Sequence, residues 1–237
     1  AMKVALIGAS GMVGSAIRDE ALSRGHQVTA IVRHPEKITV KNSLLTIKKG
    51  DVLEGKVDEL VRGHDAVISA YNPGWSNPNI ADDTIKAYGA IISGVKKAKL
   101  RLLVVGGAGS LEASPGVQLI DTMQVPDLIR SAILALREVL YTLRKEKDLD
   151  WTFLSPAASF VPGTRTGKFR LGKDQVVKDD KGESKISVQD YAVAIAARER
   201  AELVPVSRDD SPLGPTEVAG PTLVTLISAG TELNWCY

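Results

Sequence analysis

Short apolar segments alternate with helical patterns along the first 155 residues of the chain. Compact apolar runs bounded by turn residues predict buried strands at residues 3–7, 27–32, 44–47, 66–69, 102–105 and 151–154. Between them, residues 13–22, 81–97 and 126–147 carry apolar side chains at the three- and four-residue spacing of amphipathic helices. This alternation predicts an α/β fold built on a doubly wound parallel sheet.

The pattern changes after Pro156. A loop is expected over residues 162–167 and a short strand over 168–171. The segment Ser187-Val188-Gln189-Asp190 has the form of a capping box and predicts a helix from there to about residue 198. Residues 198–237 are rich in Pro, Gly, Ser and Thr and have no clear period. We therefore expect one domain, with a core over 1–155, a smaller region over 156–197 and an atypical tail over 198–237.

The composition narrows the possible functions. Hydrophobic residues make up 44% and charged residues 24%, as in ordinary globular proteins. Thirty basic against 28 acidic residues give a net charge of +2, so no concentrated basic face for nucleic acid is expected. The single cysteine, Cys236, excludes an intrachain disulfide and a cysteine-cluster metal site. The three histidines are scattered, so we expect no metal.

The amino-terminal segment bears on localisation. Residues 2–7 are short and apolar like the core of a signal peptide, but glycines interrupt the run and acidic residues follow. No apolar run approaches the roughly 18–20 residues that cross a bilayer. We therefore expect a cytoplasmic chain with no membrane partner.

A glycine-rich turn, Gly8-Ala9-Ser10-Gly11-Met12-Val13-Gly14, connects the first predicted strand to the first helix. The first glycine allows a tight turn, the second lets the backbone approach a pyrophosphate, and the third lets helix and strand pack closely. The helix amides then face the anion. A tight turn without a ligand is the alternative. In this context we expect dinucleotide binding, with contacts from Gly8, Ser10, Gly11, Met12, Val13 and Gly14.

The second predicted strand ends at Arg33, where NAD-preferring enzymes usually carry an acidic residue for the ribose 2′-hydroxyl. A guanidinium suits a 2′-phosphate, so NADP(H) is favoured over NAD(H). The alternative is a solvated strand-end residue. After the third strand, Asp51 and Val52 are candidates for the adenine edge, although Asp51 could equally cap a turn.

The segment Ser69-Ala70-Tyr71-Asn72-Pro73-Gly74 leaves the fourth strand at its carboxyl end, where doubly wound sheets bind ligands. We expect the backbone of Ala70, Tyr71 and Asn72 to line the cofactor. Turn formation by Asn-Pro-Gly is a sufficient alternative explanation.

Several motifs together resemble the atypical short-chain dehydrogenase/reductase superfamily, in particular its NADH-flavin reductase-like and NAD-dependent epimerase/dehydratase-like proteins. The resemblance covers roughly the first 195 residues. It is carried by G-A-S-G-M-V-G (8–14), V-I-S-A-Y-N-P-G (67–74), L-L-V-V-G-G-A-G-S-L (102–111), D-W-T-F-L-S-P-A (150–157), P-G-T-R-T-G-K-F-R-L-G (162–172) and I-S-V-Q-D-Y-A (186–192). It implies an NAD(P)-binding Rossmann fold whose substrate-side region is 156–197. Residues 198–237 depart from the family's usual ending.

A catalytic pair of the Tyr-x-x-x-Lys type matches only Tyr141 and Lys145. In the family's register the functional pair belongs one to two turns earlier, near Arg130 and Leu134, which cannot transfer a proton. We therefore expect Tyr141 to be a packed helix residue and Lys145 a solvated one.

The other candidates for catalysis lie on loops after the fourth and fifth strands. Gly106 and Gly107 occupy the place of the family's usual catalytic serine, and Ser110 follows three residues later. Ser110 is a candidate for guiding a substrate, with loop capping as the alternative. Tyr71, with Trp75, is a candidate for flanking a planar ligand, with packing as the alternative.

The missing Tyr/Lys pair favours an NAD(P)H-dependent reductase of a flavin- or quinone-like acceptor, because such rings can take their proton from water. The alternatives are a non-enzymatic NADP(H) sensor resembling nitrogen-metabolite-repression regulators and an epimerase or dehydratase using Tyr141 and Lys145. The expected partner is a small-molecule acceptor. The helices at 81–97 and 126–147 could supply a homodimer face.

Overall fold

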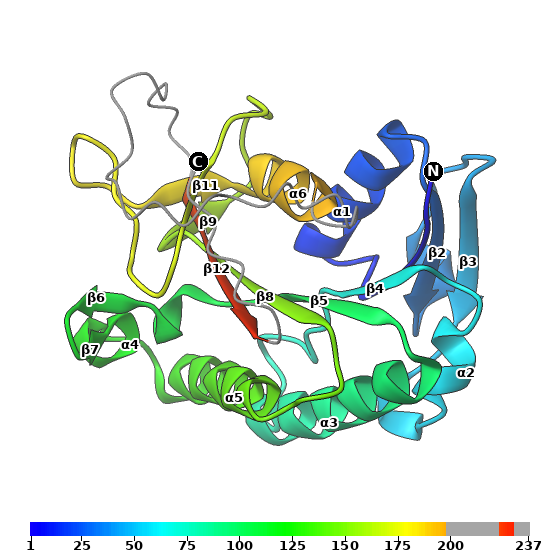
Figure 1. Ribbon diagram of the computed structural model, residues 1–237, viewed down its shortest axis with the longest axis horizontal. Coiled ribbons are helices and arrows are strands. Elements are labelled where there is room, and N and C mark those ends of the chain that lie inside the picture. The colour runs from blue at the N-terminus through cyan, green and yellow to red at the C-terminus, as the bar shows by residue number, and fades with distance from the viewer. Residues whose placement is uncertain (198–222, 230–237) are drawn as a thin grey trace.

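The computed structural model describes residues 1–197 and, for the backbone, 223–229. A mixed sheet of eight strands runs through the molecule between two layers of helices (Figure 1). The strand order is β10-β12-β8-β5-β4-β1-β2-β3. Six of these strands form a continuous parallel sheet: β1 (Lys3–Ile7), β2 (Gln27–Val32), β3 (Leu45–Lys49), β4 (Ala66–Ser69), β5 (Arg101–Val105) and β8 (Trp151–Pro156).

The order β3-β2-β1-β4-β5-β8 is the doubly wound arrangement of a Rossmann fold, as the alternating pattern predicts. Consecutive side chains of a strand point to opposite faces, and both faces are covered. In β1, Val4 and Leu6 pack into one hydrophobic core, and Ala5 and Ile7 into the other. This burial on both faces explains why the strands are continuous apolar runs.

The helices divide between the two faces (Figure 1). On one face α1 (Met12–Ser23) packs against α6 (Val188–Ala197). On the other, α3 (Ile80–Ala98) lies between α5 (Asp127–Arg144) and the short α2 (Val57–Val61). Because the chain changes face between β1 and β4, the carboxyl ends of these two strands flank a crevice.

The smaller elements lie around the carboxyl ends of the strands. Four short helices are η1 (Pro35–Lys37), η2 (Val52–Glu54), η3 (Ala108–Ser110) and α4 (Leu119–Thr122). A hairpin joins β6 (Glu112–Ser114) to β7 (Val117–Gln118), and a parallel pair joins β9 (Ser159–Val161) to β11 (Lys185–Ser187). Of these elements, η3, α4 and β9 contribute residues to the lining of the crevice.

The carboxyl-terminal elements differ in part from the expectation. The short strand expected at 168–171 is β10 (Arg170–Gly172), and the helix expected to end near 198 is described as far as Ala197. Within the tail, β12 (Leu223–Ala229) pairs antiparallel with β8 and parallel with β10. Residues 198–222 and 230–237, which include Cys236, lie outside the described part of the chain.

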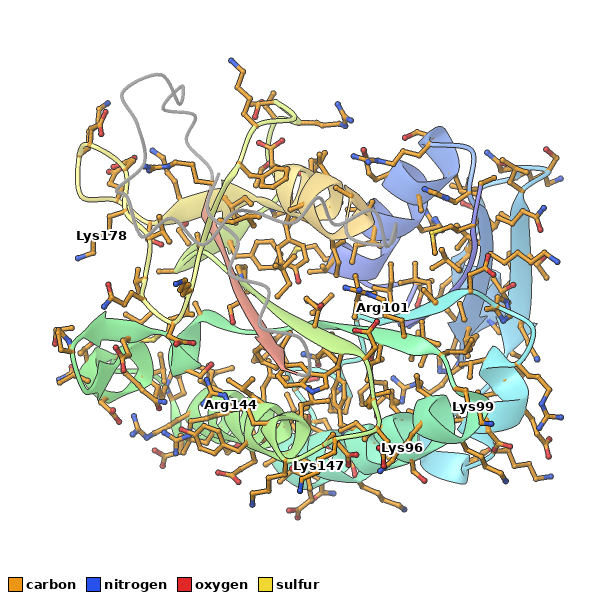
Figure 2. The ribbon with its side chains drawn as sticks, viewed as in Figure 1. Lys96, Lys99, Arg101, Arg144, Lys147 and Lys178 are labelled. Atoms are coloured by element: carbon orange, nitrogen blue, oxygen red, sulfur yellow. The ribbon has the colours of Figure 1, made fainter. Side chains whose placement is uncertain are left out.

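The outer surface of the α3 and α5 layer carries charges of both signs. Lys96, near the end of α3, lies close to Lys147 beyond α5 (Figure 2), and it pairs with Glu146 at 2.8 Å. Arg144 pairs with Asp174 at 3.7 Å. Acidic partners therefore compensate much of this basic surface. No helix in the described residues is both long and apolar enough to span a bilayer.

Candidate functional site

The turn after β1 brings three backbone segments into contact. Gly8 adopts a left-handed conformation with φ +79°, and a Cβ placed on it would lie 2.6 Å from the carbonyl oxygen of Ala70. A Cβ on Gly14 would overlap the carbonyl oxygen of Gly8. Side chains at these positions would force β1, the start of α1 and the end of β4 apart, so the close approach depends on glycine.

The amino terminus of α1 is left open toward the crevice. Its N-cap is Gly11, which has no side chain to cap the helix, and the first turn contains no acidic residue. The first amides of a helix lack intrahelical partners and carry the positive end of the helix dipole. These free amides form an anion-binding site of the kind that holds a dinucleotide pyrophosphate.

A cleft of about 590 Å³ extends from this turn across the carboxyl ends of β4, β5 and β8 to α5. Its lining is largely apolar and aromatic. Two large apolar side chains remain exposed on it, Met12 at 54% and Trp75 at 56%. The lining comprises Gly11–Gly14, Ala70–Asn72, Trp75, Ile80, Thr84, Val105–Ser110, Leu119, Met123, Ala132, Ile133, Leu136, Arg137, Phe153, Pro156–Ala158 and Phe160.

Tyr71 contributes a phenol to this cleft. Its ring meets the ring of Tyr88 edge to face, with centroids 6.3 Å apart. The Tyr71 hydroxyl is buried and has no hydrogen-bond partner among the described residues. Burial raises the pKa of Tyr71 above its ordinary value, while the positive charge of Arg33 opposes the shift. The phenol is therefore protonated at neutral pH.

The loop after β5 contributes mostly backbone to the cleft. A Cβ on Gly106 would collide with the ring of Phe153, and one on Gly107 would lie 3.1 Å from Leu136. Ser110 ends the short helix η3 and lines the cleft. Its hydroxyl makes no hydrogen bond within the described residues, so loop capping does not occupy it. The glycines thus allow the loop after β5 to pack closely against β8 and α5. The Ser110 hydroxyl remains free to bind a ligand in the cleft.

Comparison with known protein families identifies the family of the chain. Residues 8–199 match the family described as NAD(P)H-binding. The chain belongs to the NAD(P)H-binding family. The cleft fits such a cofactor, because the helix amides can take the pyrophosphate and the glycines leave room for its approach. The family match covers the cofactor half and the region over 156–197 alike.

Related proteins cover nearly the whole chain. The uncharacterized protein YwnB of Bacillus subtilis is 42% identical over 200 residues, which is 82% of this chain and 90% of YwnB. The crystal structure of a proposed epimerase from Bacteroides thetaiotaomicron is 47% identical, covers 95% of this chain and 96% of its own, and has a TM-score of 0.78. A proposed NADH-flavin reductase from Streptococcus pneumoniae is 32% identical, with coverages of 96% and 100% and a TM-score of 0.74. The two solved structures share the fold but bear names of different reactions.

Within this NAD(P)H-binding protein, most of the predicted cofactor residues surround the cleft. Gly11, Met12, Val13 and Gly14 line it on one side, and Ala70, Tyr71 and Asn72 on the other. Gly8 belongs to the turn but does not line the cleft, and Ser10 is exposed on the same turn. Arg33 is exposed and makes no salt bridge among the described residues. Its charge acts on Tyr71, so it lies within electrostatic range of the cleft.

The two residues suggested for the adenine edge have local structural roles. The Asp51 carboxylate accepts a hydrogen bond from the Leu53 amide at 2.9 Å and caps η2, which was the alternative interpretation. Val52 is buried in the core between the sheet and α3. Neither residue lines the cleft. The Val52 side chain is thus unavailable to adenine, and a contact from this segment stays a prediction.

The Tyr-x-x-x-Lys pair lies outside the cleft. The Tyr141 hydroxyl accepts a hydrogen bond from the Gln118 side chain at 3.0 Å, and its ring is partly buried against the core. Lys145 is exposed just beyond the end of α5. Neither residue lines the cleft. Arg130, at the earlier register, donates to the carbonyl oxygen of Ile120 at 3.2 Å.

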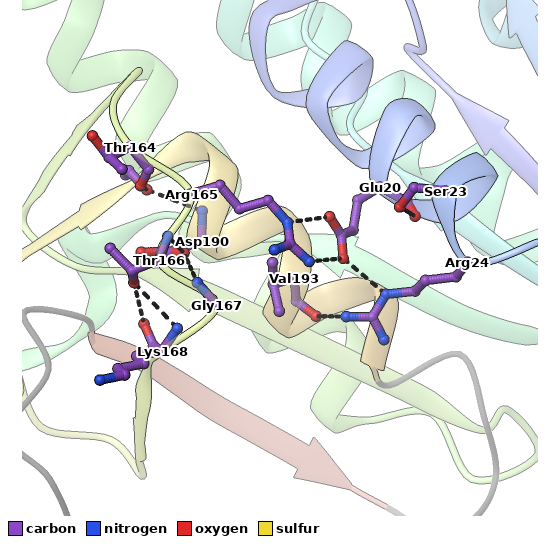
Figure 3. A network of polar contacts seen from close by, with 11 residues as sticks. Glu20, Ser23, Arg24, Thr164, Arg165, Thr166, Gly167, Lys168, Asp190 and Val193 are labelled. Atoms are coloured by element: carbon purple, nitrogen blue, oxygen red, sulfur yellow. Dashed lines mark hydrogen bonds and ion pairs between the residues drawn. The ribbon is translucent and has the colours of Figure 1, made fainter.

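A polar network that no sequence motif predicted joins the region after β8 to α1 (Figure 3). Arg165 makes two hydrogen bonds to the Glu20 carboxylate, at 2.8 and 3.0 Å. Arg24 contacts the same carboxylate at 2.9 Å. The hydrogen bond from Arg165 lowers the pKa of Glu20 below its ordinary value, with Arg24 adding to the effect against the opposing cost of burial.

The capping-box residue Asp190 anchors the same loop (Figure 3). Its amide donates to Ser187 Oγ at 3.0 Å, which confirms the predicted cap. Its carboxylate, however, accepts hydrogen bonds from the amides of Thr166 and Gly167 and from the Thr166 hydroxyl, at 2.7–2.8 Å. The loop over 162–167 is thereby held against α1 and α6.

Proposed function

We propose that this protein is an NADP(H)-dependent oxidoreductase of the flavin reductase-like type, which passes hydride to a flat, conjugated acceptor such as a flavin or quinone. The observation that carries the proposal is the composition of the cleft. It joins a dinucleotide-binding turn to an apolar, aromatic wall, and the described residues that line it include no Tyr/Lys proton-transfer pair.

The chemistry fits this wall. When bound, the dinucleotide supplies the hydride. The chain's own residues orient the two reactants, since Tyr71 and Trp75 border the opening and can lie against a planar ring. The Ser110 hydroxyl lines the cleft and can donate a hydrogen bond to an acceptor oxygen. An acceptor that spreads charge over a conjugated ring needs no stronger acid from the protein.

The choice of NADP(H) over NAD(H) rests on Arg33. It follows β2, where the ribose lies in this fold, and no acidic side chain of the described residues pairs with it. Its guanidinium is therefore available for a 2′-phosphate. We place the reaction in the cytoplasm with a small-molecule acceptor as the partner.

The test is an assay of NADPH oxidation with FMN, FAD and quinones as acceptors. The rate is measured as the loss of the reduced nicotinamide. Turnover above the protein-free background with at least one acceptor is expected. No turnover with any acceptor would refute the reductase. If NADP then bound tightly and was discriminated from NADPH, the sensor would be the better explanation.

The relative described as an epimerase makes a second reaction testable. An epimerase or dehydratase would rely on Tyr141 and Lys145, which both lie off the cleft. Lys145→Met should therefore leave the measured activity intact. A loss of turnover in this variant, with unchanged cofactor binding, would favour the epimerase or dehydratase.

A further inference from the structure

Arg137, on α5, is the only charged residue among the described residues that line the cleft. The side chains around it on this wall, including Leu119, Met123, Ile133 and Leu136, are apolar. No sequence motif assigns a role to Arg137. The apolar wall indicates only that the acceptor has an apolar surface. The single positive charge of Arg137 indicates in addition the sign of the charge that the acceptor carries.

The guanidinium is held in place by a short relay of side chains. Arg137 Nη1 donates to Gln118 Oε1 at 2.8 Å, and Gln118 Nε2 donates to the Tyr141 hydroxyl at 3.0 Å. The guanidinium carbon lies 5.8 Å from the centroid of the Tyr141 ring, within the range of a cation–π contact. Tyr141 thus acts as a positioning residue for Arg137, and the side chain is oriented before a ligand arrives.

Arg137 has no counter-charge in the described part of the chain. It forms no salt bridge within the described residues, and its Nε is buried without a hydrogen-bond partner. Arg144, two turns later on the same helix, provides the contrast. Its guanidinium lies at the same 5.8 Å from the Tyr141 ring, but it pairs with Asp174 and does not line the cleft. A partly buried cation without a partner is costly, and an anionic ligand would offset that cost.

We propose that Arg137 binds an anionic group of the acceptor, a carboxylate or a phosphate monoester carried beside its conjugated ring. The inference rests on the proposed reductase function, because it assigns the acceptor of that reaction. The planar guanidinium can donate two parallel hydrogen bonds to either oxyanion. The ring of the same acceptor then lies along the apolar wall between Arg137 and the glycine turn.

The test compares matched acceptor pairs that differ in one charged group. FMN is paired with riboflavin, and anthraquinone-2-carboxylate with anthraquinone-2-carboxamide. Affinities are measured by titration calorimetry in the presence of saturating NADP⁺, so that no turnover occurs. The measured quantity is the ratio of the neutral compound's Kd to that of its anionic partner. The first pair reports on a phosphate and the second on a carboxylate.

In the wild type at least one pair should show a ratio of about tenfold or more, as for a charge-assisted hydrogen bond. Arg137→Met keeps the apolar stem and should bring that ratio toward one. The matched control Arg144→Met should keep the wild-type ratio. Arg137→Gln serves as a second variant, checked for folding by its melting curve, and should behave like Arg137→Met.

Two results would overturn the inference. One is a wild-type ratio near one for both pairs, and the other is a ratio that persists in both Arg137 variants. The NADPH oxidation assay separates this outcome from the fate of the proposed function. Absence of turnover together with an Arg137-dependent ratio would refute the reductase and retain the anion site. Turnover with a ratio near one would refute the anion site alone.

Discussion

Tyr71→Phe should stabilise the ligand-free protein. The substitution keeps the ring and its edge-to-face contact with Tyr88 and removes only a hydroxyl that is buried without a partner among the described residues. In water the unfolded chain hydrates this hydroxyl, whereas the folded chain leaves it unpaired. Removing it therefore removes a cost that only the folded state carries.

The size of the effect follows from the burial of this one group. A buried hydroxyl without a hydrogen bond costs about 1–3 kcal/mol. Because Tyr71 as a whole is only partly buried, we expect a gain of about 0.5–1.5 kcal/mol in the free energy of unfolding. For a chain of this size that gain corresponds to a rise in Tm of roughly 1–6 °C. Burial raises the pKa of Tyr71, so the gain should not vary with pH around neutrality.

Two other tyrosines provide controls of opposite sign. The Tyr191 hydroxyl donates to the carbonyl oxygen of Leu154 at 2.8 Å, and the Tyr88 hydroxyl accepts from Ser69 Oγ at 3.1 Å. Tyr191→Phe and Tyr88→Phe should each destabilise the protein by about 0.5–1.5 kcal/mol. The cost at Tyr191 stays modest because the Leu154 carbonyl also accepts from the Gly106 amide.

The assay is thermal unfolding of the wild type and the three variants, each with and without saturating NADP⁺. A lower Tm for ligand-free Tyr71→Phe than for the wild type would refute the reasoning, because the hydroxyl would then have a favourable partner. If the hydroxyl donates to the bound cofactor, NADP⁺ should stabilise the wild type more than Tyr71→Phe. Equal stabilisation would exclude that contact.

Three further predictions concern the cofactor turn and the polar network. Arg33→Ala should weaken NADP binding about 10–100-fold and leave NAD binding nearly unchanged in calorimetry, and an unchanged NADP affinity would exclude the 2′-phosphate role. Because the Arg165 hydrogen bond holds the pKa of Glu20 below its usual value of 4.5, the ionised carboxylate stabilises the fold above that pH. Glu20→Gln should therefore lower the free energy of unfolding at pH 7 by about 1–2 kcal/mol, measured by urea unfolding. The difference from the wild type should shrink as the pH falls below 4.5. A difference that stays constant with pH would contradict the ionic role. Gly14→Ala should cost about 1–3 kcal/mol and weaken dinucleotide binding, while the control Gly89→Ala, whose Cβ meets nothing within 4 Å, should be neutral or slightly stabilising in the same melts.

The core of the fold was predictable because both faces of its sheet are buried. The inner strands β1, β2, β4, β5 and β8 are therefore short apolar runs, and the three- and four-residue spacing of apolar side chains identified the helices α1, α3 and α5. The third strand is the least accurate, at Leu45–Lys49 instead of 44–47, because it lies at the sheet edge with mostly exposed side chains. β9 and β11 were missed, since strands of three residues form through pairing with distant segments and leave no local pattern.

The candidate site likewise has a part that the sequence predicts and a part that it does not predict. The glycine turn was predictable because its three glycines lie within seven consecutive residues, although Gly8 is also required by the distant Ala70. Asp190 shows the limit: the S-x-x-D spacing correctly predicted its cap with Ser187, but its carboxylate serves a loop more than twenty residues earlier. Arg137 carried no signal, because an arginine on an amphipathic helix is ordinary until the position of the cleft is known.

The two ends of the cleft are made of different material. The end of the cleft at the glycine turn is built largely from glycine and other small residues of the turn over 8–14 and the loop over 106–109, which leave the main chain accessible, whereas the α5 end presents larger side chains such as Arg137. A point mutation replaces a side chain in one step, but it leaves a peptide amide where it was. Proteins with this fold can therefore evolve to reduce or bind a different molecule while they continue to bind the same nucleotide. This offers a physical reason why relatives that share one architecture bear the names of different reactions.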